Sequence, residues 1–192
     1  MPDLIIEPIK YQLINTEVLN AIVNSNDNKN FPYVMLTYNY KSFFNIGTAI
    51  RTSSCYTHAC WLSGKNTVST QNWKMKQVSF SEYLDGKTRI KLISGKNWTN
   101  AQKESIKWKI QDDVNAKGRY DYLGILGQLI GIPSLNANGR HYCSEEVTDI
   151  LKGTDRFFKD TFNIEHPNPS EINKYVMAHS DRYFIWVYDP TL

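Results

Sequence analysis

The sequence predicts a single α+β domain. Short apolar and aromatic segments bounded by turn residues fill the first half of the chain, as expected for strands. One more strand-like segment lies at the end of the chain. Apolar residues spaced three or four positions apart dominate much of the second half, as expected for helices. Strands that come first, followed mostly by helices and a late strand, are typical of this class.

The chain divides into an N-terminal extension, residues 1–30, and one globular domain, residues 31–192. The extension ends in the polar run "NSNDNKN" and contains one expected helix at about 15–24. The chain of 192 residues is long enough for one sizeable core, and 41% of it is hydrophobic.

Strands are expected where apolar and β-branched residues cluster between turn signals, with "SGKN" forming the turn between the second and third of them. The expected strands are 33–38, 57–63, 66–73, 88–93 and 182–188. A short helix is expected at 42–52, and a helical turn at 78–84.

Helix starts are marked by capping signals. Thr99 with Gln102 three residues later predicts a capping box at the start of a long helix. A second helix is expected after Asp121 and a third after Cys143. A fourth should begin at Asn168, which precedes a proline and has a glutamate three residues later.

Composition excludes several classes of function. The net charge is only +3, without a dominant basic cluster, so we expect no nucleic-acid partner. No apolar stretch approaches 18 residues, so no transmembrane segment is expected. The N-terminus lacks a signal-peptide pattern, which predicts a cytoplasmic location in the expressing cell, or association with the virion if the gene belongs to a phage. No phosphate-loop or dinucleotide motif is present, so no cofactor is expected.

Cys143 begins the segment "CSEEVTDIL". Val147, Ile150 and Leu151 follow at helical spacing, so all four residues should share the core-facing stripe, and Glu146 has the spacing of a cap partner. One interpretation is a small buried core residue, the usual role of a free cysteine. The other is a nucleophile, because the N–H groups and dipole at a helix N-terminus stabilise a thiolate.

A nucleophilic cysteine needs a base, and His58 is the candidate. It lies in "THACWL", an apolar strand in which His58, Cys60 and Leu62 should face the same side. The alternative is an ordinary strand histidine with satisfied hydrogen bonds. The other histidines are expected in the loop before Cys143 (His141), in a surface turn (His166) and at a helix C-terminus (His179).

The hairpin after His58 offers a group to orient the imidazole. If residues 63–66 form the turn without a bulge, His58 lies opposite Gln71, whose amide oxygen could accept the ring N–H. A one-residue bulge would bring Thr70 or Asn72 there instead. Gln71 could equally be an exposed strand residue.

A metal site is not expected. Cys55, His58 and Cys60 are close in sequence, but strand alternation places Cys55 on the opposite face from the other two. Structural metal sites usually bring a second ligand cluster, and only His141 with Cys143 is available. An odd number of cysteines, three, predicts free thiols in a reducing compartment.

The motifs "YVMLTY", "FFNIGTAI", "SSCYTHACWL", "GRYDYLGIL" and "YCSEEV" occur in this order. Over roughly residues 33–176 the chain resembles the circularly permuted papain-like superfamily, which includes relatives of the NlpC cell-wall peptidases, YiiX-like proteins and lecithin-retinol acyltransferases. It is most similar in appearance to uncharacterised phage and prophage proteins that also carry a late segment like "NPSEI". The resemblance implies a small antiparallel sheet packed against helices, with the nucleophile at a helix N-terminus.

The resemblance also implies roles for individual residues. Cys143 matches the nucleophile and His58 the base. The third, polar position falls on the strand after the histidine, where relatives often have Glu or His. This chain offers only the polar residues Ser69, Thr70, Gln71 and Asn72 there.

Four further residues belong to the matched motifs. Tyr120 and Asp121 match a "YD" motif, in which Asp121 could simply cap the next helix. Tyr142 and Ser144 flank the nucleophile and are expected either to line the cleft or to support it.

Two classes of function are therefore expected. The first is a cysteine peptidase or amidase acting through an acyl-enzyme on peptide or cell-wall substrates, with lipid acyl esters as a further option within the superfamily. The second is a catalytically weak or inactive structural or binding module, for example in a phage particle.

Overall fold

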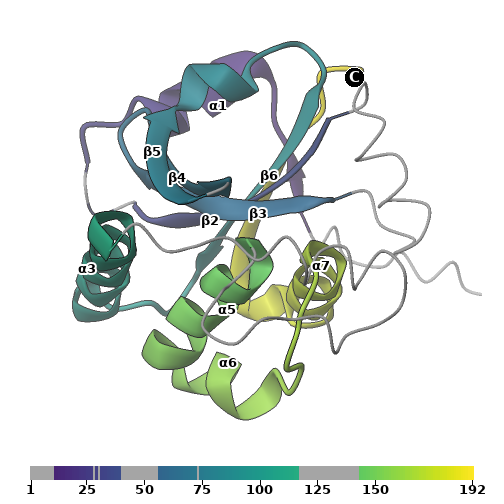
Figure 1. The fold of residues 1–192 in the computed structure, drawn as a ribbon. Coiled ribbons are helices and arrows are strands. Elements are labelled where there is room, and N and C mark those ends of the chain that lie inside the picture. The colour runs from purple at the N-terminus through teal and green to yellow at the C-terminus, as the bar shows by residue number, and fades with distance from the viewer. Residues whose placement is uncertain (1–10, 28, 30, 40–55, 73, 117–142) are drawn as a thin grey trace, which may run out of the picture.

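The structure, a computed structural model, describes residues 11–27, 29, 31–39, 56–72, 74–116 and 143–192. Within these ranges seven strands form one curved sheet with helices on both of its faces, which confirms the α+β class (Figure 1). The strands are β1 (Gln12–Leu13), β2 (Tyr33–Asn39), β3 (His58–Gly64), β4 (Thr67–Asn72), β5 (Lys74–Ser79), β6 (Thr88–Gly95) and β7 (Tyr183–Tyr188). The helices are α1 (Thr16–Val23), α3 (Asn100–Ala116), α5 (Cys143–Thr154), α6 (Arg156–Thr161) and α7 (Pro169–Ala178), with 3-10 turns η2 (Phe80–Tyr83) and η4 (Ser180–Arg182).

The described strands follow the order β1-β7-β6-β2-β3-β4-β5 across the sheet. Strands β2 to β5 pair as an antiparallel meander, and β6 and β7 continue the sheet beyond β2. Strand β1 pairs in parallel with β7. The small antiparallel sheet that the resemblance implies is larger in the structure, with seven strands, and its β1–β7 pair is parallel.

The five predicted strands correspond to β2, β3, β4, β6 and β7. Strand β5 was not predicted, because its sequence "KMKQVS" contains exposed polar residues where a strand signal would be apolar. It lies at the end of the described sheet, where lysines are common because they discourage pairing with another chain. A helical turn was expected at 78–84. In the structure its helical part is shorter and covers Phe80–Tyr83.

The hairpin between β3 and β4 contains a bulge. Trp61 pairs with Ser69 and Leu62 with Val68, and the register then shifts so that Gly64 pairs with Thr67. The expected bulge-free register, with His58 opposite Gln71, is wrong. The turn is shorter than expected, because Asn66 adopts a left-handed conformation (φ 50°) and Ser63 becomes the extra residue of the bulge.

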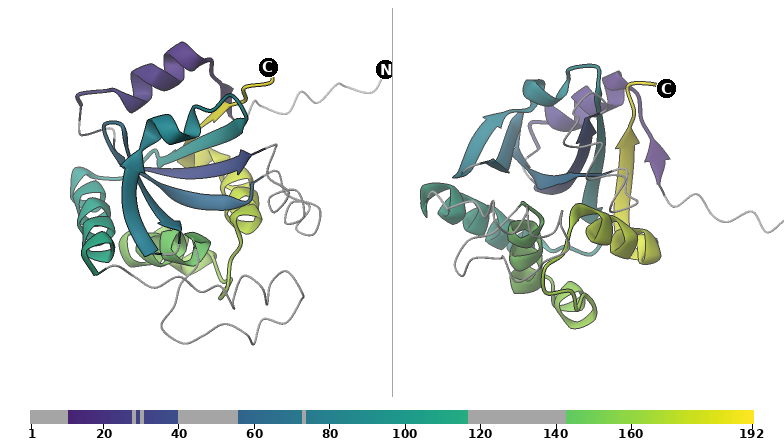
Figure 2. Two further views of the ribbon diagram at one scale, coloured as in Figure 1. Left: turned by 45° about the horizontal axis from the view of Figure 1, so that its top comes forward. Right: turned by 45° about the vertical axis from the view of Figure 1, so that its right-hand side comes forward.

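The sheet separates two hydrophobic clusters. On the face that we call the helix face, side chains such as Trp61 pack against α3, α5, α6 and α7. On the opposite face, the α1 face, Cys60 and Leu62 pack with Leu19 and Val23 of α1. Both views in Figure 2 show α1 and the α5–α7 group on opposite sides of the sheet.

The helix starts agree with the capping signals. Asn168 and Glu171 form the predicted capping box at α7, and Thr99 and Gln102 exchange the equivalent bonds before α3. Helix α5 begins at Cys143, as predicted. The helices expected at 42–52 and after Asp121 lie outside the described residues. In the described parts of the chain, no helix has both the length and the apolar character that crossing a membrane requires.

Candidate functional site

Cys143 is the first residue of the 12-residue helix α5 and is only 5% exposed. Val147, Ile150 and Leu151, which share its stripe, are buried in the cluster on the helix face. Cys143 is a free thiol, as is Cys60, and Cys55 lies outside the described residues. This position fits both interpretations of Cys143. A buried thiol can be a core residue, and a thiolate would be stabilised by the positive end of the helix dipole.

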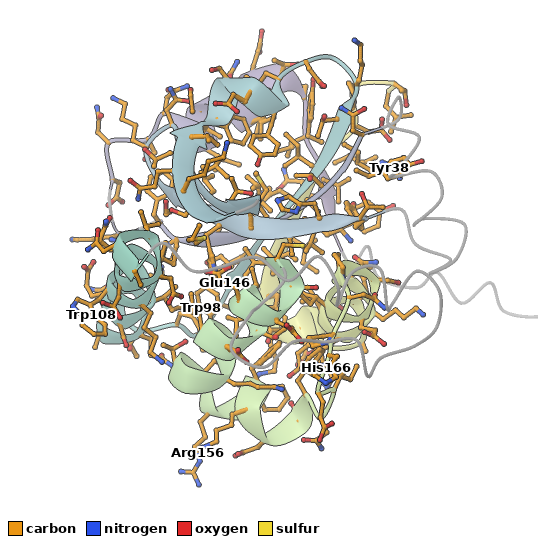
Figure 3. The ribbon with its side chains drawn as sticks, in the orientation of Figure 1. Tyr38, Trp98, Trp108, Glu146, Arg156 and His166 are labelled. Atoms are coloured by element: carbon orange, nitrogen blue, oxygen red, sulfur yellow. The ribbon has the colours of Figure 1, made fainter. Side chains whose placement is uncertain are left out.

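The residues after Cys143 fix the start of α5 to the segment before α7. The buried Ser144 hydroxyl donates to the Pro167 carbonyl oxygen at 2.6 Å. One residue on, the Glu145 carboxylate lies 2.7 Å from Nδ1 of His166. Figure 3 shows His166 on the side of α5 that faces α7. These bonds hold the first turn of α5 in place, so Ser144 has a supporting role.

His166 was expected in a surface turn, and its carboxylate partner, Glu145, was not predicted. Its side chain is 46% exposed, whereas that of Glu145 is 7% exposed. Because 21 residues separate the two, no local pattern could have revealed the pair.

Glu146 brings a buried carboxyl group next to Cys143. Burial raises its pKa well above the usual value, and negative charge on Asp113, Cys143 and Asp149 raises it further. The Trp61 indole N–H lies beside the carboxyl and favours its charged form, but without the geometry of a full hydrogen bond. Neither carboxyl oxygen has a hydrogen-bond partner among the described residues, so the expected capping bond is not made.

His58 is the first residue of β3 and is partly buried. Its Nε2 lies 2.7 Å from the Thr70 hydroxyl oxygen on β4. Thr70 is one of the two residues, with Asn72, that a bulged hairpin was expected to bring to His58 in place of Gln71. The Gln71 and Asn72 side chains lie outside the described part of the structure.

Ser69 does not contribute to the orientation of His58. Its hydroxyl bonds that of the bulge residue Ser63 at 2.8 Å and accepts a longer bond from the Gln77 amide. Ser69 therefore stabilises the bulge itself, and the bulge sets which residue of β4 meets His58.

Cys60 lies within electrostatic reach of both predicted catalytic side chains. Complete burial raises the pKa of its thiol, the nearby His58 imidazole lowers it, and negative charge on Cys143 raises it. The charges of His58 and Cys143 therefore both act on the Cys60 thiol.

The two faces of β3 pack against different parts of the protein. Cys60 belongs to the cluster on the α1 face, and His58 contacts both Cys60 and Thr70. Helix α5 packs on the other face, against Ala59 and Trp61. Cys143 therefore approaches the strand from the helix face, whereas the His58 side chain is held by partners on the α1 face.

Tyr120, Asp121 and Tyr142 lie outside the described residues. Among the residues that are described, no group of three or more His, Cys, Asp or Glu side chains is arranged to hold a metal ion.

The chain was compared with models of protein families and with curated proteins, and neither comparison found a match.

Proposed function

We propose that the protein is a thiol-dependent hydrolase that cleaves amide bonds, with Cys143 as nucleophile and His58 as base. One observation carries the proposal. Cys143 starts a helix that packs against the strand of His58, and Cys60 on that strand responds to the charge of both residues. A thiol at a helix N-terminus beside an oriented imidazole is the usual arrangement for thiol activation.

Thr70 takes the role of the third residue. Its hydroxyl at 2.7 Å fixes Nε2 of His58, which leaves Nδ1 as the ring nitrogen that exchanges a proton with the thiol. A hydroxyl carries no charge, so it orients the ring without the electrostatic support that a carboxylate gives to an imidazolium.

The reaction has two halves. His58 takes the Cys143 proton, the thiolate attacks the carbonyl carbon, and the amine leaves with the proton from His58 as the thioester forms. Water then loses a proton to His58 and attacks the thioester, which releases the acid and restores the thiol. The N–H groups of the first turn of α5, which are not used by the helix's own bonds, stabilise the oxyanion.

Substrate class rests on the sequence resemblance, which favours peptide amides such as those of peptidoglycan. Digestion of peptidoglycan and of peptide amides, analysed by mass spectrometry, should release new carboxyl and amino ends. A parallel assay with lipid acyl esters tests the alternative substrate. Cys143→Ser should abolish any true activity in either assay.

Alkylation by iodoacetamide, resolved by peptide mass spectrometry, tests the nucleophile directly. Cys143 should react about tenfold or more faster than the fully buried Cys60, because the thiolate is the reactive form. His58→Ala should slow this reaction, and His179→Ala serves as the matched histidine control. Equal, slow labelling of both cysteines, or no effect of His58→Ala, would contradict the proposal.

A second function, a non-enzymatic binding or structural module, is favoured by a different observation. The partners of His58 lie on the α1 face, whereas α5 packs on the helix face. An imidazole held on the α1 face is directed away from the face on which α5 packs. The module then retains the fold while Cys143 reacts like an ordinary buried thiol.

A further inference from the structure

A hollow of about 430 Å³ opens between three segments that are far apart in the sequence. They are the connection from β6 to α3, the helix α6, and the turn η4 where it enters β7. Its volume is in the range of small-molecule sites. None of the proposed catalytic residues Cys143, His58 and Thr70 lines it. The hollow is therefore a candidate site formed by other residues.

Two aromatic side chains form fixed walls of the hollow. The Trp98 indole packs directly on the backbone of Gly95, where it leaves no room for a Cβ atom, and its Nε1 donates to Asp155 Oδ2 at 2.9 Å. Tyr183 is 5% exposed and its hydroxyl oxygen is buried, so its ring lines the hollow. Both walls are held in place without a ligand.

Most polar groups of the hollow are already used inside the protein. Asp155 accepts the indole N–H with one oxygen and the Phe158 backbone N–H with the other. The Gln102 side chain accepts from the Thr99 backbone N–H and donates to the Thr154 carbonyl oxygen. These groups shape the hollow and have little hydrogen-bonding capacity left for a ligand.

Arg156 is directed away from the hollow, although it contributes to the rim. Its side chain is 95% exposed, and its Nε lies 3.6 Å from Asp160 Oδ2. Figure 3 shows the Arg156 side chain extending outward from the protein. Its charge is therefore offset by Asp160 and screened by solvent.

Arg182 is held in place and has no carboxylate partner in the described parts of the chain. Its guanidinium carbon lies 3.8 Å from the centre of the Phe157 ring, which supports the cation. Its backbone N–H donates to the His179 carbonyl oxygen, and its own carbonyl oxygen accepts the Lys96 N–H. A guanidinium positioned in this way suits an anion from outside the protein, because its planar fork matches the two oxygens of a carboxylate.

The charges around the hollow limit which anion fits. Asp155 and Asp160 line the same hollow, so each additional negative charge on a ligand adds repulsion. A carboxylate carries one charge, whereas a phosphate monoester carries about −1.5 to −2 near pH 7. The exposed Asn97 amide at the rim has a donor and an acceptor, the combination that a peptide bond requires.

We propose that this hollow binds a carboxylate group of a peptide, with Arg182 as the residue that binds the carboxylate and Phe157 as its support. The carboxylate belongs either to the C-terminus of the peptide or to an acidic side chain, and both present the same group to Arg182. This proposal does not depend on the proposed function, because Cys143 and His58 take no part in it.

Side-chain ¹⁵N NMR of the labelled full chain detects binding at Arg182, whose Nε–H signal is assigned by its loss in Arg182→Gln. Two probes carry the carboxylate: acetyl-trialanine with a free C-terminus, and an amidated acetyl-tripeptide with glutamate in the middle. At least one should shift the Arg182 signal saturably, and which of them does so identifies the source. The amide of acetyl-trialanine should not. If neither carboxylate probe binds, or if this amide binds equally well, the proposal is wrong.

Ligand-observed NMR compares the dissociation constants of variants for the probe that binds. Arg182→Gln should weaken binding about tenfold or more, and Arg182→Lys, which keeps the charge without the fork, about threefold or more. Arg156→Gln is the matched arginine control and should bind like the wild type. Binding that is lost in Arg156→Gln and retained in Arg182→Gln would contradict the assignment.

Phe157→Leu tests the support without touching Arg182, should Arg182→Gln not show the circular dichroism of the wild type. It should weaken binding severalfold, whereas Phe184→Leu, at a 49% exposed aromatic residue outside the hollow, should not. Equal effects of the two substitutions would refute the role of Phe157.

Two further measurements separate the alternatives. Inorganic phosphate should bind more weakly than the carboxylate probe, and tighter phosphate binding would overturn the choice of ligand. Cys143→Ser should bind the probe like the wild type. A protein that binds the probe but hydrolyses nothing therefore contradicts only the proposed function, whereas hydrolysis without binding at Arg182 contradicts only this proposal.

Discussion

At the scale of single residues, Glu146 is a carboxyl group buried within the helix-face packing. It follows Cys143 by one helical turn and faces Trp61 of β3 and Asp113 of α3, and Figure 3 places it on the side of α5 toward α3. A carboxyl group in such surroundings resists ionisation, because a second negative charge beside the Cys143 thiolate would be unscreened. Negative charge on Cys143 therefore opposes ionisation of Glu146.

Glu146→Gln should change how stability depends on pH. The pKa of Glu146 is raised in the folded state above 4.5, its ordinary value, so the wild type keeps its full stability below that pH. Stability then falls as the pH rises toward the folded pKa, by up to about 1.4 kcal/mol per pH unit. The glutamine side chain does not titrate. The free energy of unfolding of the variant should therefore increase relative to that of the wild type from about pH 5 to 7.

Urea unfolding at pH 4, 5.5 and 7 measures the difference. Glu17→Gln, at an exposed glutamate in the first turn of α1, gives the effect of removing a surface carboxylate. A constant difference between wild type and Glu146→Gln across this range would show that Glu146 ionises normally.

At the scale of elements, α7 is tied to α5 at its start. The capping box of Asn168 and Glu171 begins α7, and the preceding residue, Pro167, accepts the Ser144 bond from the first turn of α5. The short segment Pro167–Asn168 thus leads into α7 and also holds the first turn of α5. Its geometry therefore determines where the first turn of α5, and with it Cys143, is held.

Asn168→Ala should lower the free energy of unfolding by about 1 kcal/mol, because the N–H of Glu171 loses its side-chain acceptor. Asn168→Ser keeps an acceptor at the same position and should stay close to wild type. Thermal and urea denaturation report both values. If serine and alanine are equally destabilising, the side-chain cap is not the cause.

At the scale of the whole molecule, the N-terminal segment closes the α1 face of the sheet. Strand β1 pairs with β7, and Leu19 and Val23 of α1 are almost completely buried with Leu62 and Val68. The cluster that contains Cys60 is therefore covered by residues that precede it by more than 30 positions. The stability of this face should therefore depend on α1.

Leu19→Ala should destabilise the protein by about 3 kcal/mol, since it leaves a cavity under α1. Val18→Ala, at the adjacent, 41% exposed position, is the matched control and should have a small effect. If α1 and the sheet unfold together, a single transition shifts in denaturant. A first, separate transition in Leu19→Ala would instead show that α1 detaches on its own.

Sequence patterns alone predicted the α+β class, five of the strands and the starts of α3, α5 and α7. These features depend on local spacing and capping chemistry, which act over a few residues. Strand β5 was missed because an edge strand carries polar residues that hide its pattern. The pairing of β1 with β7 could not be predicted, because it joins residues more than 170 positions apart.

The candidate residues Cys143, His58 and Thr70 were all available from the sequence, but their relation was not. A single bulge at Ser63 decided that Thr70, and not Gln71, meets His58, because one extra residue exchanges the faces of every later side chain in the strand. The pairing of Glu145 with His166 and the burial of Glu146 arise from contacts between distant elements. The sequence by itself determined which residues are available for chemistry, and only tertiary packing decided which of them meet.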